Sequence, residues 1–244
     1  MMNTHEKIGH IESWLDNYRK ENSIESFVVG ISGGIDSSVV STLCARTGVP
    51  TYVVSMPIKQ KPEQHSLSLA HGEWLEEKYG NVKYLVRDLT KIFIEFEEKF
   101  DDMQSDLAFA NSRARLRMMT LYQVAQSRNG IVVGTGNKVE DFGVGFYTKY
   151  GDGGVDISPI ADCMKTEVWD MGRVLGVDER IIDAAPTDGL WDDGRNDQGQ
   201  LGMSYSELEA AMLGEGPQEN IDKFLSIQKK NLHKMNPIPV CKVS

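Results

Sequence analysis

Short apolar runs alternate with amphipathic segments along most of this chain. The runs are rich in β-branched residues and predict buried strands at Phe27–Ile31, Thr51–Met56, Lys83–Val86, Ile131–Val133 and Asp156–Ile160. The segments between them repeat apolar residues every three or four positions, which is typical of helices. Because buried parallel strands are continuous apolar runs, the pattern predicts an α/β fold, a doubly wound parallel sheet of about five strands with helices on both faces.

The predicted helices lie between and after these strands. The first follows the turn Ser32–Gly34 and ends before Gly48 and Pro50, two residues that stop helices. Further helices are predicted at Glu63–Tyr79, Asp106–Arg128 and Lys165–Leu175, with two C-terminal helices over Tyr205–Lys234 that are split near Gly214–Pro217. The stretches Gly134–Gly154 and Pro186–Gly202 are irregular, and loops of such length are usually functional. Without an internal repeat, residues 1–244 are expected to form a single domain.

The composition narrows the class of protein. The 244 residues carry 26 Lys and Arg against 36 Asp and Glu, a net charge of −10 that argues against a broad nucleic-acid surface. No apolar run reaches the roughly 18 residues of a membrane span, and the N-terminus lacks a signal-peptide core. Three cysteines, Cys44, Cys163 and Cys241, lie far apart without metal-ligand spacing, which favours a reducing, cytoplasmic location. If a chain this acidic binds phosphate, we expect it to do so through a few local groups and not through an overall positive field.

The segment Ser32-Gly33-Gly34-Ile35-Asp36-Ser37-Ser38 joins the first predicted strand to its helix. Two glycines allow a tight turn that exposes backbone N–H groups, and the start of a helix adds partial positive charge, so the segment fits a cradle for pyrophosphate. The alternative is an ordinary strand–turn–helix in which Asp36 or Ser37 caps the helix. The segment is not a Walker A loop, because no Gly-Lys-Ser/Thr follows it. Gly134-Thr135-Gly136 lacks the third glycine of a dinucleotide fingerprint.

The Ser32–Ser38 segment resembles the pyrophosphate loop of the N-type ATP pyrophosphatases, a superfamily of adenylating enzymes. Further segments narrow the choice among its members. They are Asn111–Met118, Gly134–Glu140, Gly145–Asp156, Ala185-Pro186-Thr187 and His233-Lys234. In this order they resemble the NAD synthetase family over most of the chain from Phe27 onward.

The resemblance implies a fold like that of the adenine-nucleotide alpha hydrolases and a ligase activity. The expected reaction is the ATP-dependent amidation of deamido-NAD to NAD, the last step of NAD biosynthesis, through an adenylated nicotinate with release of AMP and pyrophosphate. ATP is the expected co-substrate and Mg²⁺ the expected metal. Only about 26 residues precede the first predicted strand, too few for a glutaminase domain. Free ammonia is therefore the expected nitrogen source, unless a separate glutaminase subunit supplies it.

The resemblance also assigns roles to individual residues. The ATP contacts that it implies are Gly30, Ile31, Ser32, Gly33, Gly34, Ile35, Asp36, Ser37, Thr135, Lys165 and Thr187. The implied magnesium ligands are Asp36 and Glu140, two carboxylates that suit an octahedral hard cation. The implied contacts to deamido-NAD are Arg115, Lys149, Asp156, His233 and Lys234.

Asp152 and Lys165 are the implied catalytic residues. Asp152 lies among three glycines, where an aspartate ordinarily forms a turn, whereas the family mechanism would have it accept a proton from ammonium. Lys165 stands near a helix start, where the helix dipole disfavours a cation, and this placement points to a neighbouring anion. Arg113 and Arg117 share the helix face opposite Arg115, so we expect both of them to be solvated.

Several alternatives stay open at this point. Another ATP pyrophosphatase would share Ser32–Ser38, but a thiolating enzyme is expected to have paired cysteines or a basic surface, and a GMP synthetase to lack Tyr147–Asp156 in this form. A nucleotide sensor would bind ATP without turnover and would leave the acidic residues of the site without a purpose. The family resemblance also implies a homodimer. An apolar stripe on the helix Asp106–Arg128 fits either a dimer contact or the core, and its members are Leu107, Ala110, Ala114, Met118, Leu121 and Ala125. The loop Pro186–Gly202 is expected to act as a lid.

Overall fold

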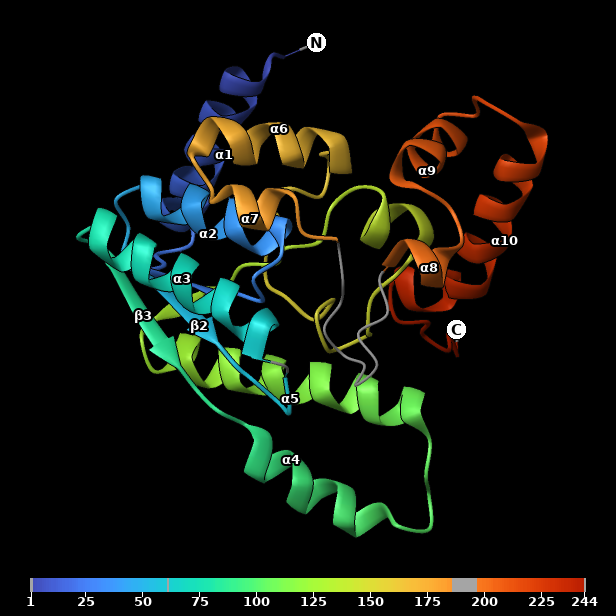
Figure 1. The fold of residues 1–244 in the computed structure, drawn as a ribbon, viewed down its shortest axis with the longest axis horizontal. Helices are drawn as coiled ribbons and strands as arrows, with labels where there is room; N and C mark the ends of the chain where they lie inside the picture. Colours follow the sequence, from blue (N-terminus) through green and yellow to red (C-terminus); the bar gives the residue numbers. More distant parts are fainter. Residues whose placement is uncertain (1, 61, 186–196, 244) are drawn as a thin grey trace.

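A parallel sheet of four strands lies at the centre of the computed structural model, which describes residues 2–60, 62–185 and 197–243. The strand order is β3–β2–β1–β4, and β3 and β2 are seen side by side in Figure 1. In register, Phe27 pairs with Thr51 on one side and with Ile131 on the other. The strands are β1 (Ser26–Gly30), β2 (Thr51–Ser55), β3 (Val82–Val86) and β4 (Gly130–Val132). The predicted α/β class and parallel sheet are confirmed.

The segment Asp156–Ile160 does not form the predicted fifth strand. Its contact with the sheet is an isolated parallel bridge between Ile157 and Val133. The N–H of Val132, which a neighbouring strand would otherwise bind, donates to Oδ2 of Asp156 at 2.8 Å. Pro159 follows and has no N–H to donate, so the ladder does not continue.

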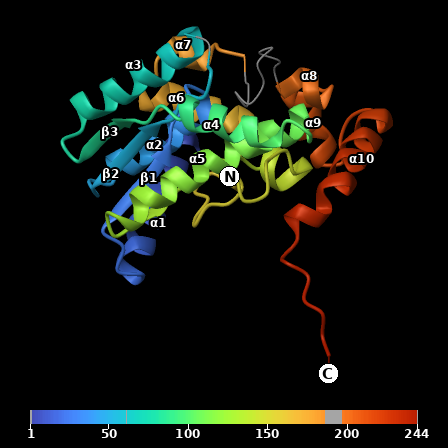
Figure 2. The ribbon, with the colours of Figure 1, turned by 90° about the horizontal axis from the view of Figure 1, so that it is seen from below.

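Helices cover both faces of the sheet (Figures 1 and 2). One face carries α1 (Thr4–Glu21), α2 (Ile35–Arg46), α3 (Pro62–Lys78) and α6 (Lys165–Leu175), with α7 (Glu179–Ile182) beside α6. The other face carries α5 (Asp106–Gln126), which packs on β1 and β4, and α4 (Thr90–Glu97) packs in turn on α5. The predicted helices on both faces are therefore present, with α1, α4 and α7 in addition, and the short helix α8 (Asp197–Leu201) lies within the segment that we expected to be a loop.

Two of the helices that we did not predict, α1 and α4, have clear local causes. In α1, Asn3 and Glu6 form a capping box, and Ile8, Ile11 and Leu15 lie on one buried face. In α4, Phe93 is the buried residue, and a single buried position leaves little periodic signal in so short a helix. No helix in the described part of the chain is both long and apolar enough to cross a bilayer.

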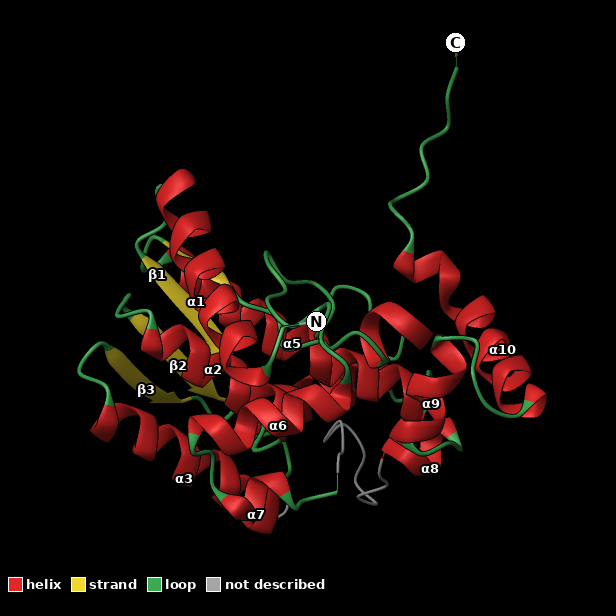
Figure 3. Cartoon of the chain, turned by 90° about the horizontal axis from the view of Figure 1, so that it is seen from above, coloured by secondary structure: helices red, strands yellow, loops and turns green. Residues whose placement is uncertain are grey.

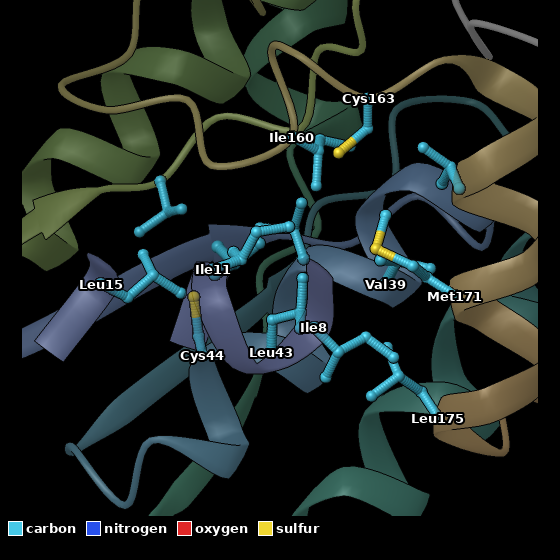
Figure 4. Close-up of a cluster of buried hydrophobic side chains, with 14 of the residues drawn as sticks. Ile8, Ile11, Leu15, Val39, Leu43, Cys44, Ile160, Cys163, Met171 and Leu175 are labelled. Atoms are coloured by element: carbon cyan, nitrogen blue, oxygen red, sulfur yellow. The ribbon is translucent and has the colours of Figure 1, made fainter. Parts of the chain in front are cut away.

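Alternate residues of β1 point into two separate cores. Phe27 and Val29 belong to the cluster on the α2 side, where residues of α1, α2 and α6 such as Leu15, Leu43 and Met171 meet (Figure 4). Val28 points the other way, into the cluster that contains Met118 and Leu121 of α5. Burial on both faces fixes the position of β1, and therefore of the turn at its carboxyl end.

The C-terminal helices lie to one side of the sheet (Figures 1 and 3). They are α8 (Asp197–Leu201), α9 (Tyr205–Met212) and α10 (Gln218–Met235), and the last two confirm the predicted split near Gly214–Pro217. They pack on η2, a short π-helical turn over Glu140–Val144, through a cluster that includes Val144, Leu208 and Phe224. Gly145 follows η2 with φ 67°, and a Cβ there would come within 2.8 Å of the Asn231 side chain. The C-terminal helices are thus held against the irregular segment that follows β4.

Candidate active site

The predicted pyrophosphate turn lies between β1 and α2, at the carboxyl end of the sheet. Gly33 has φ 86°, and Gly34 rather than Asp36 or Ser37 is the N-cap of α2. The hydroxyls of Ser37 and Ser38 donate to the carbonyl of Gly34 at 3.0 and 2.9 Å, which fixes the turn. The capping alternative for Asp36 is therefore wrong, and the first N–H groups of α2 point out of the helix beside a carboxylate.

Asn137 joins this turn to the loop after β4. It is fully buried, and its Nδ2 donates to Asp36 Oδ1 at 3.1 Å and to Glu140 Oε2 at 2.8 Å. Its Oδ1 accepts the backbone N–H groups of Val139 and Glu140, both at 3.0 Å. One amide therefore orients both of the predicted metal-binding carboxylates. We did not predict this role, although an asparagine after a strand and a Gly-Thr-Gly turn is a residue that commonly bonds to a nearby backbone.

Lys165, the first residue of α6, completes this cluster. Its side chain is 1% exposed, and Nζ donates to Asp36 Oδ2 at 2.5 Å and to Glu140 Oε1 at 2.9 Å. Burial alone would lower the pKa of Lys165, but the charges of Asp36 and Glu140 raise it above its ordinary value, so the ammonium keeps its proton. Burial raises the pKa of Asp36, and the lysine charge offsets part of that rise. The anion that we expected near Lys165 is therefore present within the protein itself.

Tyr205 reaches the same cluster from α9. Its hydroxyl donates to Glu140 Oε1 at 2.5 Å, and its ring lies 5.0 Å from the ammonium of Lys165. The ring also meets Trp169 of α6 edge to face, with centroids 5.5 Å apart. We did not predict Tyr205 either, because no sequence pattern connects the start of α9 with a carboxylate 65 positions earlier.

The cluster suits a divalent cation in combination with phosphate. Asp36 and Glu140 bind one ammonium between them, so their oxygens already converge on a cation. Among the residues that the structure describes, no group of three or more His, Cys, Asp or Glu side chains is arranged to hold a metal. Magnesium usually takes one or two protein carboxylates and completes its shell with phosphate oxygens and water. The residues present fit that mode of binding.

A second group of predicted residues lies around the turn that follows η2. Oδ1 of Asp152 accepts the N–H of Thr148 at 3.0 Å, and the Thr148 hydroxyl donates to Asn111 Oδ1 at 2.6 Å. The turn-forming interpretation of Asp152 is therefore present in the structure. Asp152 as a whole is an exposed residue. Its place beside a turn leaves it accessible to a small molecule.

Lys234 and His233 are neighbours on α10 but point in different directions. Lys234 Nζ donates to the carbonyl of Tyr147 at 2.6 Å, while the Tyr147 hydroxyl donates to the carbonyl of Lys234 at 2.7 Å. Burial lowers the pKa of Lys234, although the charges of Asp152 and Asp141 oppose that shift. His233 is exposed, because successive helical positions are rotated by about 100°. The structure places Lys234 with Asp152 and leaves His233 outside this group.

The three arginines on α5 lie in different environments. Arg115 is exposed, and its Nε donates to the carbonyl of Lys149 at 3.2 Å, which brings two predicted contacts together. Our expectation that Arg113 and Arg117 are solvated is wrong. Arg113 is 6% exposed and lies 4.9 Å from the Phe93 ring, and Arg117 donates to the carbonyl of Met56 at 3.1 Å. Their long side chains pack between α4, α5 and the end of β2.

The remaining predicted residues lie apart from these groups. Asp156 accepts the Tyr122 hydroxyl at 2.9 Å and the N–H of Val132 at 2.8 Å, so its carboxylate supports the edge of β4. Thr135 follows β4 at the carboxyl end of the sheet and is partly exposed. Thr187 and most of the loop that we expected to act as a lid lie outside the described residues.

Comparison with known proteins decides the family. The family model described as NAD synthase matches residues 7–238. The chain belongs to the NAD synthase family. Among curated relatives, the NH(3)-dependent NAD(+) synthetase of Carboxydothermus hydrogenoformans is 37% identical over 239 residues, with 96% of each chain covered. That of Mesoplasma florum is 35% identical over 240 residues, again with 96% of each chain covered. The expected family is therefore confirmed, and the chain is a ligase.

Solved structures agree on the fold of this NAD synthase family member. The NMN synthetase of Francisella tularensis has a TM-score of 0.91 at 30% identity, with 99% of each chain covered. The NH3-dependent NAD synthetase of Campylobacter jejuni has a TM-score of 0.81 at 22% identity, and the match covers 99% of this chain and 100% of that one. The glutamine-dependent NAD+ synthetase of Acinetobacter baumannii, solved with ADP, has a TM-score of 0.69 at 19% identity over 99% of this chain and 48% of its own. At these last two identities the likeness concerns the fold alone.

Proposed function

We propose that this chain amidates deamido-NAD to NAD, with free ammonia as the nitrogen source and ATP as the activating co-substrate. The observation that carries the proposal is the cluster of Asp36, Glu140 and Lys165 beside the start of α2, where no side chain caps the helix. Such a cluster next to a helix N-terminus suits a polyphosphate and its metal. Free ammonia is supported by the curated relatives, which are named NH(3)-dependent and match over nearly their full length.

The proposed reaction has two steps. An oxygen of the nicotinate carboxylate attacks the α-phosphorus of ATP, and pyrophosphate leaves. Ammonia then attacks the carbonyl carbon of the acyl-adenylate, and AMP leaves with one of the original carboxylate oxygens. Adenylation is needed because a free carboxylate is a poor acyl donor, whereas AMP is a good leaving group.

Each group of the cluster has a distinct proposed task. The N–H of Gly33 and the first N–H groups of α2 bind the pyrophosphate portion of ATP, and Lys165 stabilises the charge that develops on it. Asp36 and Glu140 would hold Mg²⁺, which supplies further charge stabilisation when it is bound. Asp152 is the proposed acceptor of a proton from ammonium, because it is an exposed residue in the turn that carries Lys149.

A second substrate is favoured by one specific comparison. The NMN synthetase of Francisella tularensis matches this chain with a TM-score of 0.91 over 99% of both chains. Formation of NMN by the same chemistry requires nicotinate mononucleotide, which shares the reacting carboxylate with deamido-NAD and lacks its adenylate half. The two candidates therefore share the cluster around Lys165 and differ in what they need from Arg115, Lys149 and Lys234.

One assay separates the candidates. Purified protein is incubated with ATP, Mg²⁺, ammonium and either deamido-NAD or nicotinate mononucleotide, and the amide product and pyrophosphate are quantified to obtain kcat/KM. We expect the higher kcat/KM with deamido-NAD and one pyrophosphate for each amide. A higher value with the mononucleotide replaces our first substrate by the second. Orthophosphate as the product, or no amide with either substrate, would refute the proposed reaction, and a parallel reaction with glutamine tests the nitrogen source.

We also propose a homodimer through the outer face of α4 and α5. The apolar stripe that we noted on α5 is mostly buried in the core, with Leu107 as its exposed member. Other large apolar side chains on and around α4 and α5 are exposed, and they are Ile92, Ile94, Phe96, Phe100, Met103, Leu107 and Met119. Where such side chains gather on a surface, they commonly mark an interface. Light scattering on a size-exclusion column should give about twice the chain mass, and Ile92→Glu should shift the protein toward the monomer.

A further inference from the structure

We propose that Tyr205 is a positioning residue for Glu140 and that it adjusts the affinity of the site for metal-bound ATP. The inference rests on the proposed function, because it assigns Glu140 to the metal. It adds a residue from the C-terminal helices to a site whose other members come from α2, α6 and the segment that follows β4. Tyr205 is buried and contributes both a hydroxyl and an aromatic ring to the cluster.

The hydrogen bonds around Glu140 show why one more donor matters. Oε1 accepts from Lys165 at 2.9 Å and from Tyr205 at 2.5 Å, and Oε2 accepts from Asn137 at 2.8 Å. If Lys165 turns toward a bound phosphate, Tyr205 and Asn137 are the side chains that still hold the Glu140 carboxylate. A phenol makes a strong bond to a carboxylate and adds no charge that would compete with the metal.

The position of Tyr205 is itself fixed by contacts between α9 and α6. Ser204 and Glu207 form a capping box at the start of α9, so the backbone at Tyr205 is defined. Four residues later, Glu209 accepts the N–H and the hydroxyl of Thr166, both at 2.9 Å, at the N-terminal end of α6. The first turns of α6 and α9 are therefore bonded to each other. Through them Lys165 and Tyr205 meet at the same oxygen of Glu140.

The test is Tyr205→Phe, which removes the hydroxyl and keeps the ring against Trp169. Binding of Mn²⁺ together with ATP is measured by calorimetry without a pyridine nucleotide, so that no turnover occurs. The Mg²⁺ dependence of pyrophosphate release is then measured with the full set of substrates. Tyr18→Phe is the matched control, because Tyr18 lies beside Trp14 on α1, away from the cluster.

We expect Tyr205→Phe to weaken Mn²⁺ binding in the presence of ATP roughly tenfold, which is the effect of one hydrogen bond to a charged group. The Mg²⁺ concentration for half-maximal activity should rise by a similar factor, with kcat at saturating Mg²⁺ changed less than about threefold. Tyr18→Phe should match the wild type in both measurements. A merely structural role for Tyr205 would lower the melting temperature without moving metal affinity.

Two results would overturn the proposal. One is a Tyr205→Phe variant that binds Mn²⁺ and ATP as the wild type does. The other is a variant whose kcat falls while its metal dependence stays the same. Failure of the proposed function is recognised separately, as a wild-type protein that makes no amide from either pyridine nucleotide, and the binding measurement still tests Tyr205 in that case.

Discussion

The proposed phosphate side of the candidate site and its proposed pyridine-nucleotide side are built differently. On the phosphate side, Lys165 is 1% exposed and every carboxylate oxygen of Asp36 and Glu140 accepts a hydrogen bond. On the pyridine-nucleotide side, Arg115 is exposed and donates to a backbone carbonyl rather than to a carboxylate. The first region is held together by hydrogen bonds within the protein itself, whereas the second presents Arg115 to solvent.

The difference in burial matches two different tasks, the chemical step and the recognition of the substrate. Preorganised charges stabilise developing charge at little cost in reorganisation, so the phosphate side is suited to chemistry. Exposed cations are suited to recognising a large anionic substrate, and a neighbouring copy of the chain at the face of α4 and α5 would add to that surface. Mutations should therefore reduce kcat and stability on the first side and raise KM on the second.

The largest expected effect follows replacement of Lys165 by Met. The change leaves two carboxylates facing each other without their cation, and loss of one partner of a buried ion pair costs about 3–5 kcal/mol. Turnover should fall by about 100- to 1000-fold, as it does when one donor to a developing charge is removed. Urea unfolding and pyrophosphate release measure the two effects. Lys138→Met is the control: Lys138 pairs with Asp162, whose side chain is 94% exposed, and its loss should cost less than about 1 kcal/mol.

The helices α2 and α3, which flank the proposed phosphate side, should become less stable in acid because of His71. This residue of α3 is buried, its Nε2 lies 3.0 Å from the Ser41 hydroxyl of α2, and burial lowers its pKa to about 4. The unfolded chain therefore binds more protons than the folded one between pH 6.5 and 4, and stability is lost as the pH falls through that window. The loss from this residue is about 3 kcal/mol.

Urea titrations across pH 4–7 test this expectation. The free energy of unfolding of His71→Gln should fall less steeply below pH 6.5 than that of the wild type, whereas His10→Gln, at an exposed position of α1, should keep the wild-type slope. Equal slopes for His71→Gln and the wild type would show that this histidine does not titrate differently in the folded state.

Asp36→Ala should lower turnover by about 100-fold or more while the fold survives, because it removes one of the two carboxylates at the proposed phosphate site. Pyrophosphate release measures the first effect and circular dichroism the second. The comparable change at an exposed position, Asp162→Ala, should leave turnover within about twofold. An active, metal-independent Asp36→Ala variant would remove this residue from the site.

The smallest effect is expected on the exposed side. Arg115→Ala should raise KM for deamido-NAD by about tenfold, in line with the loss of one charged contact, and should change stability by less than about 0.5 kcal/mol. Arg173→Ala, at an exposed position of α6, should change neither quantity. A fall in kcat without a change in KM would contradict this expectation, because Arg115 would then act like the residues of the phosphate side and not in substrate recognition.

The sequence allowed the phosphate side to be predicted to a large extent. The Ser32–Ser38 turn could be located because a strand, two glycines and a helix follow one another without a gap. The placement of Lys165 near a helix start correctly indicated a nearby anion. Asn137 and Tyr205 could not be assigned in the same way, because their roles depend on contacts between separate elements that bear no fixed spacing in sequence.

The exposed side was harder to predict for physical reasons. His233 and Lys234 are adjacent in sequence, yet a helix directs them to different sides. Arg113 and Arg117 carry charges that favour solvent, yet their long side chains bury against Phe93 and Met56. Asp156 ends up bonded to the edge of β4, which a sequence motif does not reveal. Residue type alone does not determine which surface a flexible charged side chain reaches.

The central claim is that the cluster of Asp36, Glu140 and Lys165 activates a carboxylate by adenylation. The most direct measurement uses deamido-NAD, or nicotinate mononucleotide, labelled with ¹⁸O in both carboxylate oxygens, with ATP, Mg²⁺ and ammonium. Mass spectrometry then locates the label after turnover by the wild-type protein. The account predicts one ¹⁸O in AMP and one in the carboxamide of the product. Label in pyrophosphate or orthophosphate, or unlabelled AMP alongside the amide, would contradict it.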